Sequence, residues 1–231
     1  GSWSYLFAMF GVTLGGVFII STLIGVLTSG IEGKLDELRK GRSKVVEHNH
    51  TVVLGWSDHL FTFLSELVTA NENKKDACIV VLSEKDKVEM EDEIKDKLGE
   101  LKSTRIVCRT GSPIDLNDLE IAGIHSSKSI VVFAPEVDDP DPEVVKIILA
   151  ITNHPRRRKQ PYHIVAELHE PKNVEIARMV GRDEVELVVV SDLVARVIAQ
   201  TCRQSGLSVV YQELLDFDGD LYGRQLSVAF V

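Results

Sequence analysis

Five carboxylates are gathered in one short stretch of the chain, residues 136–143, which reads EVDDPDPE. Two prolines stiffen this loop, and packed carboxylates suit a hard cation such as Ca²⁺, which takes about six to eight oxygen ligands. The spacing matches no calcium-loop motif, and Asp141 could instead cap the helix that follows. We therefore take Asp138, Asp139 and Asp141 as candidate ligands of a regulatory Ca²⁺.

A second candidate site follows the first predicted strand, where residues 55–60 read GWSDHL. A dinucleotide fingerprint needs glycine at positions 55, 57 and 60, and only Gly55 complies. Ser57 still lets its backbone approach a phosphate, but Leu60 would crowd the contact between helix and strand, and Asp58 places a negative charge where a pyrophosphate would lie. We expect a ligand other than NAD here, with Gly55, Ser57 and Asp58 among the binding residues.

Two charged residues follow the next predicted strands. Glu84 occupies the place of the carboxylate that binds ribose in nucleotide-binding folds, and Arg109 could bind an anion. Both could equally be solvated loop charges. The sequence contains neither a nucleophile elbow nor a phosphate loop of the GxxxxGK type. We therefore expect a ligand-binding protein and not an enzyme.

The elements that must position these residues alternate regularly from residue 51 onward. Continuous runs of Val, Ile and Leu indicate strands buried on both faces, hence a parallel sheet covered by helices. The order predicts an α/β fold, a Rossmann-like doubly wound parallel sheet, which binds ligands beyond the carboxyl ends of its strands. The predicted strands are 51–56, 78–82, 104–108, 129–134, 163–168 and 185–190. The predicted helices are 58–70, 87–101, 115–122, 141–152, 172–180 and 192–204.

Local signals mark several helix ends. Asp58 and Asp192 are placed to cap the starts of two helices, because aspartate side chains accept hydrogen bonds from the first free N–H groups. Pro171 precedes another helix, and Gly123 and Gly181 each follow one.

The first 31 residues contain no charged side chain, and the first charge is Glu32. A helix that spans a bilayer needs roughly 20 apolar residues to cross ~30 Å of hydrocarbon. A signal peptide would carry a cationic segment before its apolar region, and a core helix would show a polar stripe; residues 5–31 have neither. We predict one transmembrane helix within residues 1–31.

Basic residues follow this helix directly, at Lys34, Arg39, Lys40, Arg42 and Lys44, so the positive-inside tendency places the C-terminal side in the cytosol. Small residues within the helix usually permit close helix packing. An alternative is that Gly25, with Thr28 and Ser29 one turn later, forms the hinge or gate of a pore-lining helix.

Composition narrows the function further. The formal charge of −9 argues against nucleic acid as a partner and is compatible with binding cations. Three widely spaced cysteines suggest reduced thiols in a cytosolic domain. We divide the chain into a transmembrane helix (1–31), a helical linker (32–49), a Rossmann-like domain (50–207), and a crossover helix with the truncated start of a further lobe (208–231).

Several motifs resemble known regulatory domains. Residues 111–116 (GSPIDL), 122–124 (AGI) and 129–132 (SIVV) resemble the RCK domain, the regulator found on potassium channels, as do residues 163–185 and 193–206. A narrower resemblance joins residues 34–58, which end in the turn GWSD, with residues 108–113 (CRTGSP). These segments resemble the CASTOR/POLLUX family of ion channels.

The resemblance implies a homotetrameric cation channel in which the RCK domains form a cytosolic gating ring that responds to Ca²⁺. It implies that residues 5–29 are the inner pore helix, and it adds Gly111 to the candidate ligand-binding residues. Permeant cations and membrane lipid are the other expected partners. The expected location is a bacterial cell membrane, or an organelle or nuclear membrane if the protein comes from a plant.

Two other classes of function stay open at this point. One is a membrane-tethered NAD-binding oxidoreductase, which needs a working dinucleotide site and a substrate domain. The other is a non-conducting regulatory adaptor that oligomerises to recruit partners. No selectivity filter is visible, and we expect the chain to be a piece of a longer protein.

Overall fold

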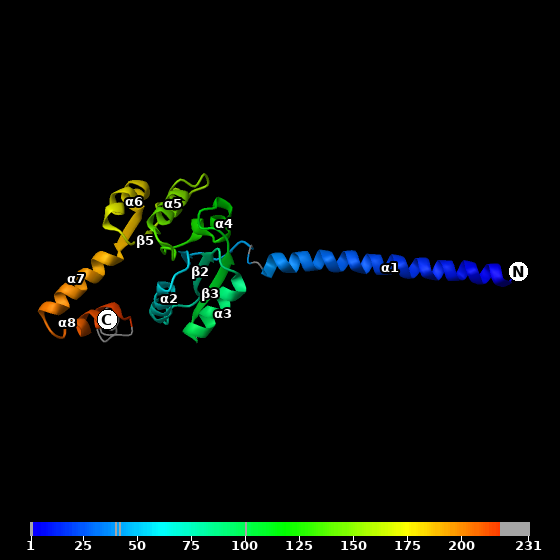
Figure 1. The fold of residues 1–231 in the computed structure, drawn as a ribbon, viewed down its shortest axis with the longest axis horizontal. Coiled ribbons are helices and arrows are strands. Elements are labelled where there is room, and N and C mark those ends of the chain that lie inside the picture. Colours follow the sequence, from blue (N-terminus) through cyan, green and yellow to red (C-terminus); the bar gives the residue numbers. More distant parts are fainter. Residues whose placement is uncertain (1, 40, 42, 100, 218–231) are drawn as a thin grey trace. The chain divides into compact units, whose positions relative to one another are not determined.

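The computed structural model describes residues 2–39, 41, 43–99 and 101–217 and divides the chain into two compact units, Gly1–Lys40 and Gly41–Val231. The first unit is a single helix, α1 (Ser2–Arg39), drawn in blue in Figure 1. Its segment Ser2–Ile31 is long and apolar enough to cross a membrane, and its large apolar side chains are exposed. The predicted membrane-spanning helix is therefore present as a continuous, uncovered apolar helix.

The helical linker predicted over residues 32–49 is shorter in the structure. Helix α1 runs through residue 31 without a break and ends at Arg39. Gly41 then adopts a φ of +65°, the left-handed conformation with which glycine commonly ends helices. Residues 43–50 have no regular secondary structure and lead directly into the first strand.

The second unit is built on a sheet of six parallel strands in the order β3-β2-β1-β4-β5-β6. The central strand β1 pairs on both sides, so that Val52 lies opposite Val80 of β2 and Ile130 of β4. The connection reverses direction between β1 and β4, as in doubly wound folds. This confirms the predicted fold class. The strands are β1 (Thr51–Leu54), β2 (Ala77–Ser83), β3 (Thr104–Thr110), β4 (Ser129–Val132), β5 (Ile164–Leu168) and β6 (Val185–Val189).

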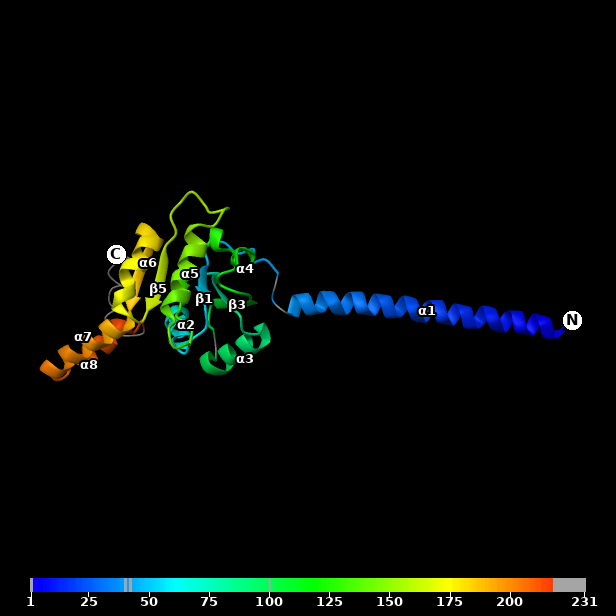
Figure 2. The same cartoon turned by 45° about the horizontal axis from the view of Figure 1, so that its top comes forward.

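Helices cover the sheet in two layers, visible from two directions in Figures 1 and 2. Successive residues of a strand point to opposite faces, so Val53 belongs to one apolar cluster and Val52 to the other. The first cluster packs under α2 and α3, and the second under α4, α5 and α6. The helices are α2 (His59–Ala70), α3 (Lys87–Leu98), α4 (Leu116–Ile121), α5 (Asp141–Thr152), α6 (Val174–Gly181), α7 (Val190–Arg203) and α8 (Leu207–Leu215), with short 3₁₀ turns at Ile124–Ser126, Pro171–Asn173 and Arg182–Glu184.

The predicted caps at Asp58 and Asp192 are wrong. Asp58 precedes α2, but its side chain makes no capping hydrogen bond. Helix α7 begins two residues before Asp192, whose carboxylate instead binds Arg196 one turn later at 2.8 Å. Aspartate does cap two other helices, where Asp86 accepts from the N–H of Val88, and Asp115 accepts from two N–H groups of the first turn of α4.

The predicted crossover region, residues 208–231, contains helix α8. Helices α7 and α8 are separated by a turn in which Gly206 has a φ of +89°. The rest of the predicted further lobe, residues 218–231, lies outside the described residues, as do Lys40 and Arg42 of the basic segment.

Candidate functional site

A cavity of about 300 Å³ opens at the carboxyl edge of the sheet. The loops that follow β1, β2, β3 and β4 line it, and they contribute Trp56, Glu84, Ser112 and Val137 among others. This is the place where a doubly wound sheet binds its ligand. Of the residues predicted for the site, Gly55 and Glu84 line this cavity.

Gly55 allows β1 to end against β4. Its N–H donates to the carbonyl of Leu82 at 3.0 Å, and its φ is +100°. A Cβ at this position would lie only 2.8 Å from the carbonyl oxygen of Phe133. Only glycine fits both the backbone conformation and the close approach.

One wall of the cavity is aromatic. The Trp56 ring packs edge-on against Phe61, with 5.5 Å between centroids, and the ammonium of Lys85 lies 4.9 Å from the centroid of the Trp56 ring. Lys85 also forms an ion pair with Glu93, and the ammonium of Lys97 lies 3.7 Å from the ring of Phe61. These cation–π contacts hold the wall in place.

The carboxyl edge is rich in carboxylates. Glu84 and Glu143 line the cavity, and Oε1 of Glu136 accepts the N–H of Asp58 at 3.0 Å. Carboxylates at a recessed edge favour a cationic ligand over a phosphate.

Glu167 is an acidic residue near this edge that the sequence analysis did not predict. It comes from β5, and its side chain is only 8% exposed. Its Oε1 lies 2.9 Å from Nδ1 of His59 and 3.6 Å from Nε2 of His169, and its Oε2 accepts the N–H of Ala134 at 3.3 Å. The signal in the sequence was a lone acid inside an otherwise apolar parallel strand, near its carboxyl end.

Two of the residues predicted beside Gly55 point elsewhere. Ser57 is buried, and its hydroxyl has no hydrogen-bond partner within the described part of the chain. The Asp58 side chain is 89% exposed and lies 4.0 Å from the ammonium of Lys97. The lining of the 300 Å³ cavity includes neither residue.

Two other predicted site residues, Arg109 and Gly111, stabilise the local backbone. Nε of Arg109 donates to the carbonyl of Ser43 at 2.8 Å, so this guanidinium holds the segment before β1. Gly111 donates its N–H to Ser83, and a Cβ there would lie 2.7 Å from the carboxyl carbon of Asp118. The glycine thus permits the turn that Asp118 stabilises.

The acidic loop separates into two environments. Asp141 is fully buried and accepts hydrogen bonds from the N–H of His169 (2.8 Å), the N–H of Glu170 (3.0 Å) and Nδ2 of Asn173 (2.7 Å). Burial alone would raise the pKa of this carboxyl, but the hydrogen bonds from Asn173, His169 and Glu170 lower it overall. Asp138 and Asp139 are exposed instead, so the three predicted ligands do not share one environment.

The comparison with protein families decides the identity of the second unit. Residues 46–165 match the model of the calcium-activated potassium channel slowpoke-like RCK domain. Residues 191–226 match the model described as Castor and Pollux, part of voltage-gated ion channel. The chain belongs to the CASTOR/POLLUX ion channel family, and its α/β unit is an RCK domain.

Curated relatives of the family are named as ion channels. The chain is 39% identical to the probable ion channel CASTOR of Oryza sativa subsp. japonica over 209 residues, which are 90% of this chain and 23% of that protein. It is 34% identical to the probable ion channel POLLUX of Arabidopsis thaliana, covering 90% of this chain and 25% of that protein. The chain therefore spans about a quarter of the length of the curated relatives that it matches.

A solved structure supports the fold. The structure of the human SLO3 gating ring superposes with a TM-score of 0.50 and 20% sequence identity, covering 71% of this chain and 28% of that chain.

The RCK domain holds the segment that follows α1, residues 43–50, which we call the linker segment. Val45 is buried in the core, and its N–H donates to the carbonyl of Ile121 at 2.8 Å. The N–H of Asn49 donates to the carbonyl of Ser126 at 2.9 Å. These bonds fix the linker segment to the stretch between α4 and β4.

Side chains complete this attachment. His50 is buried, and its Nε2 lies 3.1 Å from the carbonyl oxygen of Ala122. Arg105 of β3 forms an ion pair with Glu47, and Arg109 binds Ser43 as described above. The linker segment is therefore part of the RCK domain and not a free tether.

The candidate hinge of α1 lies in unbroken helix. Gly25, Thr28 and Ser29 are helical and exposed, and a Cβ on Gly25 would meet no atom within 4 Å. The proposed hinge or gate at these residues stays a prediction.

Proposed function

We propose that the chain forms the inner pore helix and the first regulatory lobe of a ligand-gated cation channel, which assembles as a tetramer with a cytosolic gating ring and responds to Ca²⁺. Membership of an ion channel family supports the general function. The apolar exposed helix α1 supports a place in the membrane, and the basic residues after it support a cytosolic RCK domain.

The attachment of the linker segment carries this proposal. In the sequence only residues 40–42 separate the end of α1 from the linker segment, which is bonded to the stretch 121–128 and to β3. A displacement of the RCK domain has little intervening chain in which to be absorbed, so it must act on the pore helix.

Strand β1 connects the linker segment to the cavity at the carboxyl edge of the sheet. Strand β1 begins directly after His50 and ends at Leu54, next to Gly55 in the cavity wall. Four residues of strand span only about 13 Å, because each adds ~3.3 Å. A ligand that repositions the end of β1 thus acts close to the attachment of the linker segment.

Calcium is the regulator that the edge chemistry favours. Glu84, Glu143, Glu136 and Glu167 supply carboxylate oxygens at or beside the crevice, and Ca²⁺ binds oxygen ligands of this kind. Asp138 and Asp139 are exposed on the neighbouring loop and are a second place for the ion.

The energetics suit a tetramer. A coupling free energy of about 1–3 kcal/mol per site is typical of allosteric proteins. Four equivalent sites would supply about 4–12 kcal/mol, and about 5.5 kcal/mol moves a two-state equilibrium from 1:99 to 99:1. A ring of four can therefore open or close the pore without a large effect at any one site.

Recording from planar bilayers tests the proposal. The protein in its natural length should conduct cations, and Ca²⁺ on the RCK side should change its open probability. The double variant E84Q/E143Q should shift the Ca²⁺ dose–response if the ion binds in the crevice, and D138N/D139N should do so if it binds on the acidic loop. A membrane that stays silent with correctly folded protein would favour the adaptor instead, and turnover of NAD(H) by the purified protein would favour the oxidoreductase.

A further inference from the structure

Three side chains that could bind a metal lie near the amino ends of the strands, away from the crevice. Glu120 comes from α4, His125 from the 3₁₀ turn after it, and His154 from the turn after α5. Their ligand atoms all lie within 4.8 Å of one another. We propose that Glu120, His125 and His154 bind a divalent transition-metal ion such as Zn²⁺, which braces the stretch that holds the linker segment.

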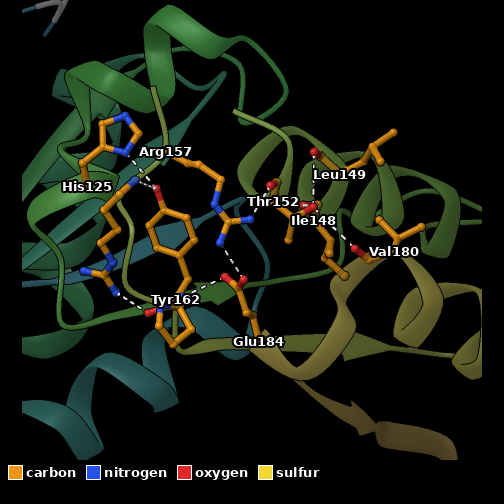
Figure 3. A network of polar contacts seen from close by, with 10 residues as sticks. His125, Ile148, Leu149, Thr152, Arg157, Tyr162, Val180 and Glu184 are labelled. Carbon is orange, nitrogen blue, oxygen red and sulfur yellow. Dashed lines mark hydrogen bonds and ion pairs between the residues drawn. The ribbon is translucent and has the colours of Figure 1, made fainter. Parts of the chain in front are cut away.

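His125 is oriented as a metal ligand would be. Its Nδ1 lies 2.8 Å from the hydroxyl of Tyr162, and a dashed line marks this contact in Figure 3. Its Nε2 is buried and has no hydrogen-bond partner in the described part of the chain. A ring nitrogen held by an outer partner, with the other nitrogen left over for the ion, is the usual arrangement of metal-bound histidine.

Tyr162 is itself fixed firmly enough to orient His125. It is only 3% exposed, its N–H donates to Oε2 of Glu184 at 2.8 Å, and the guanidinium of Arg158 lies 4.6 Å from its ring. Glu184 also binds Arg157, in the network of Figure 3. The contacts of Tyr162 therefore fix the orientation of His125.

His154 supplies the second imidazole. It is 3% exposed, and its ring packs edge-on against that of His125 with 4.7 Å between centroids. Its Nε2 lies 3.6 Å from Oε1 of Glu120 and 3.3 Å from the carbonyl oxygen of Leu116, and its Nδ1 accepts the N–H of Arg156 at 3.1 Å. Binding of the ion at Nε2 would place the ring proton on Nδ1, so it would require the Arg156 N–H to give up its bond to Nδ1.

Glu120 completes the set. Its Oε1 lies 2.9 Å from Nε of Arg156, whose side chain is 72% exposed. An ion pair this close to solvent is weak, so the carboxylate can exchange the guanidinium for a metal. Two imidazoles and a carboxylate are a donor set of zinc proteins, whereas Ca²⁺ and Mg²⁺ prefer oxygen alone. Three protein ligands leave the fourth position of the ion for water, which suits a site that exchanges its metal.

The position of this site gives it a consequence. Glu120 directly precedes Ile121, whose carbonyl accepts the N–H of Val45, and His125 directly precedes Ser126, whose carbonyl accepts the N–H of Asn49. An ion that joins Glu120 and His125 to His154 therefore crosslinks the attachment of the linker segment to the turn after α5. The effect on gating rests on the proposed function; the binding of the ion does not.

Metal competition with a chromogenic chelator tests the binding. The purified chain, without a histidine tag, should take one Zn²⁺ per chain, and excess Ca²⁺ should not displace it. The variants H125Q and E120Q should each lose affinity at least ~tenfold. The matched control is H163Q, because His163 is exposed and its Nδ1 lies 3.7 Å from Oε1 of Glu186, outside the proposed set of ligands; its affinity should stay that of the wild type.

Equal affinity in the wild type, H125Q and E120Q, or no saturable binding, would overturn the site. Because His154 is buried, its replacement could unfold the domain, so the decisive variants are those of the half-buried His125 and Glu120.

Zn²⁺ should also raise the melting temperature of the wild type and of H163Q but not of H125Q. In bilayers, Zn²⁺ should shift gating of the wild type and of H163Q but not of H125Q. If zinc binds but has no effect on a working channel, the ion does not brace the linker segment. If the channel responds to Ca²⁺ but binds no zinc, the proposed metal site is wrong and the proposed function still stands.

Discussion

The carboxylate of Asp141 accepts a hydrogen bond from the side-chain amide of Asn173 across 2.7 Å, and two backbone N–H groups bind the same carboxylate. The first residue of α5 is thereby tied to the segment that follows β5. We expect D141N to reduce the free energy of unfolding by about 1.5–3 kcal/mol, because an amide cannot accept all three bonds as a buried carboxylate does. Urea denaturation of the variant measures this loss.

The neighbouring exposed aspartate is the control. D139N should change the free energy of unfolding by less than ~0.5 kcal/mol, since surface substitutions rarely do more. Similar losses in both variants would show that the bonds around Asp141 contribute little.

Two adjacent valines test the coupling of the linker segment. Val45 is 5% exposed and packs in the core, whereas Val46 is 81% exposed. V45A should reduce the free energy of unfolding by about 1–2 kcal/mol and weaken the Ca²⁺ dependence of open probability while leaving the unitary conductance unchanged. V46A should alter neither, and a change of equal size in V46A would contradict a specific role for the buried valine. Bilayer recording and urea denaturation supply the measurements.

Two glycine positions allow the cost of backbone strain to be measured separately from the cost of a steric clash. Gly55 and Gly99 both have positive φ, but a Cβ would meet the carbonyl of Phe133 at Gly55 and nothing within 4 Å at Gly99. G99A should reduce the free energy of unfolding by about 1–2 kcal/mol, because the backbone of Gly99 (φ +67°, ψ −120°) lies in a region that other residues rarely adopt. G55A should cost at least ~2 kcal/mol, because the clash adds to that strain. Thermal denaturation would contradict this account if both variants melted at the same temperature.

His50 makes stability depend on pH. Burial lowers the pKa of His50 below the unfolded value of 6.5, so the unfolded chain binds a proton at this histidine more readily than the folded chain does. This contribution is fully present above pH 6.5 and is lost as the pH falls from there through the folded-state pKa. H50Q keeps a donor for the carbonyl of Ala122 and should lose less stability than the wild type between about pH 7.5 and about pH 5.5. Urea denaturation at both values checks this, and an identical loss in the two proteins would exclude His50 as a source.

The regular part of this fold was predictable because its signal is local. Each parallel strand is a short run of Val, Ile and Leu, and α5 was predicted at the observed bounds, 141–152. The end of α1 was not, because one glycine outweighs the helix-forming residues around it. Asp192 was misread as a cap because the acid of an i, i+4 pair looks the same in sequence as a capping residue.

The candidate sites were harder to predict because their members meet only in the folded chain. Gly55 and Glu84 were found from the rule that strand ends form the crevice, whereas Glu167 stayed hidden inside its strand. His154 lies 34 residues after Glu120, and no local pattern connects the two. By contrast His48 and His50 are close in sequence, yet one is exposed and the other buried.

The pairing of β1 on both sides has a mechanical consequence. A pull along this strand loads its hydrogen bonds to β2 and to β4 at the same moment, in shear, so that they resist together and none can open before the others. A strand at the sheet margin would peel away bond by bond under the same tension. Repeated pulling on β1 should therefore not detach the strand from the sheet.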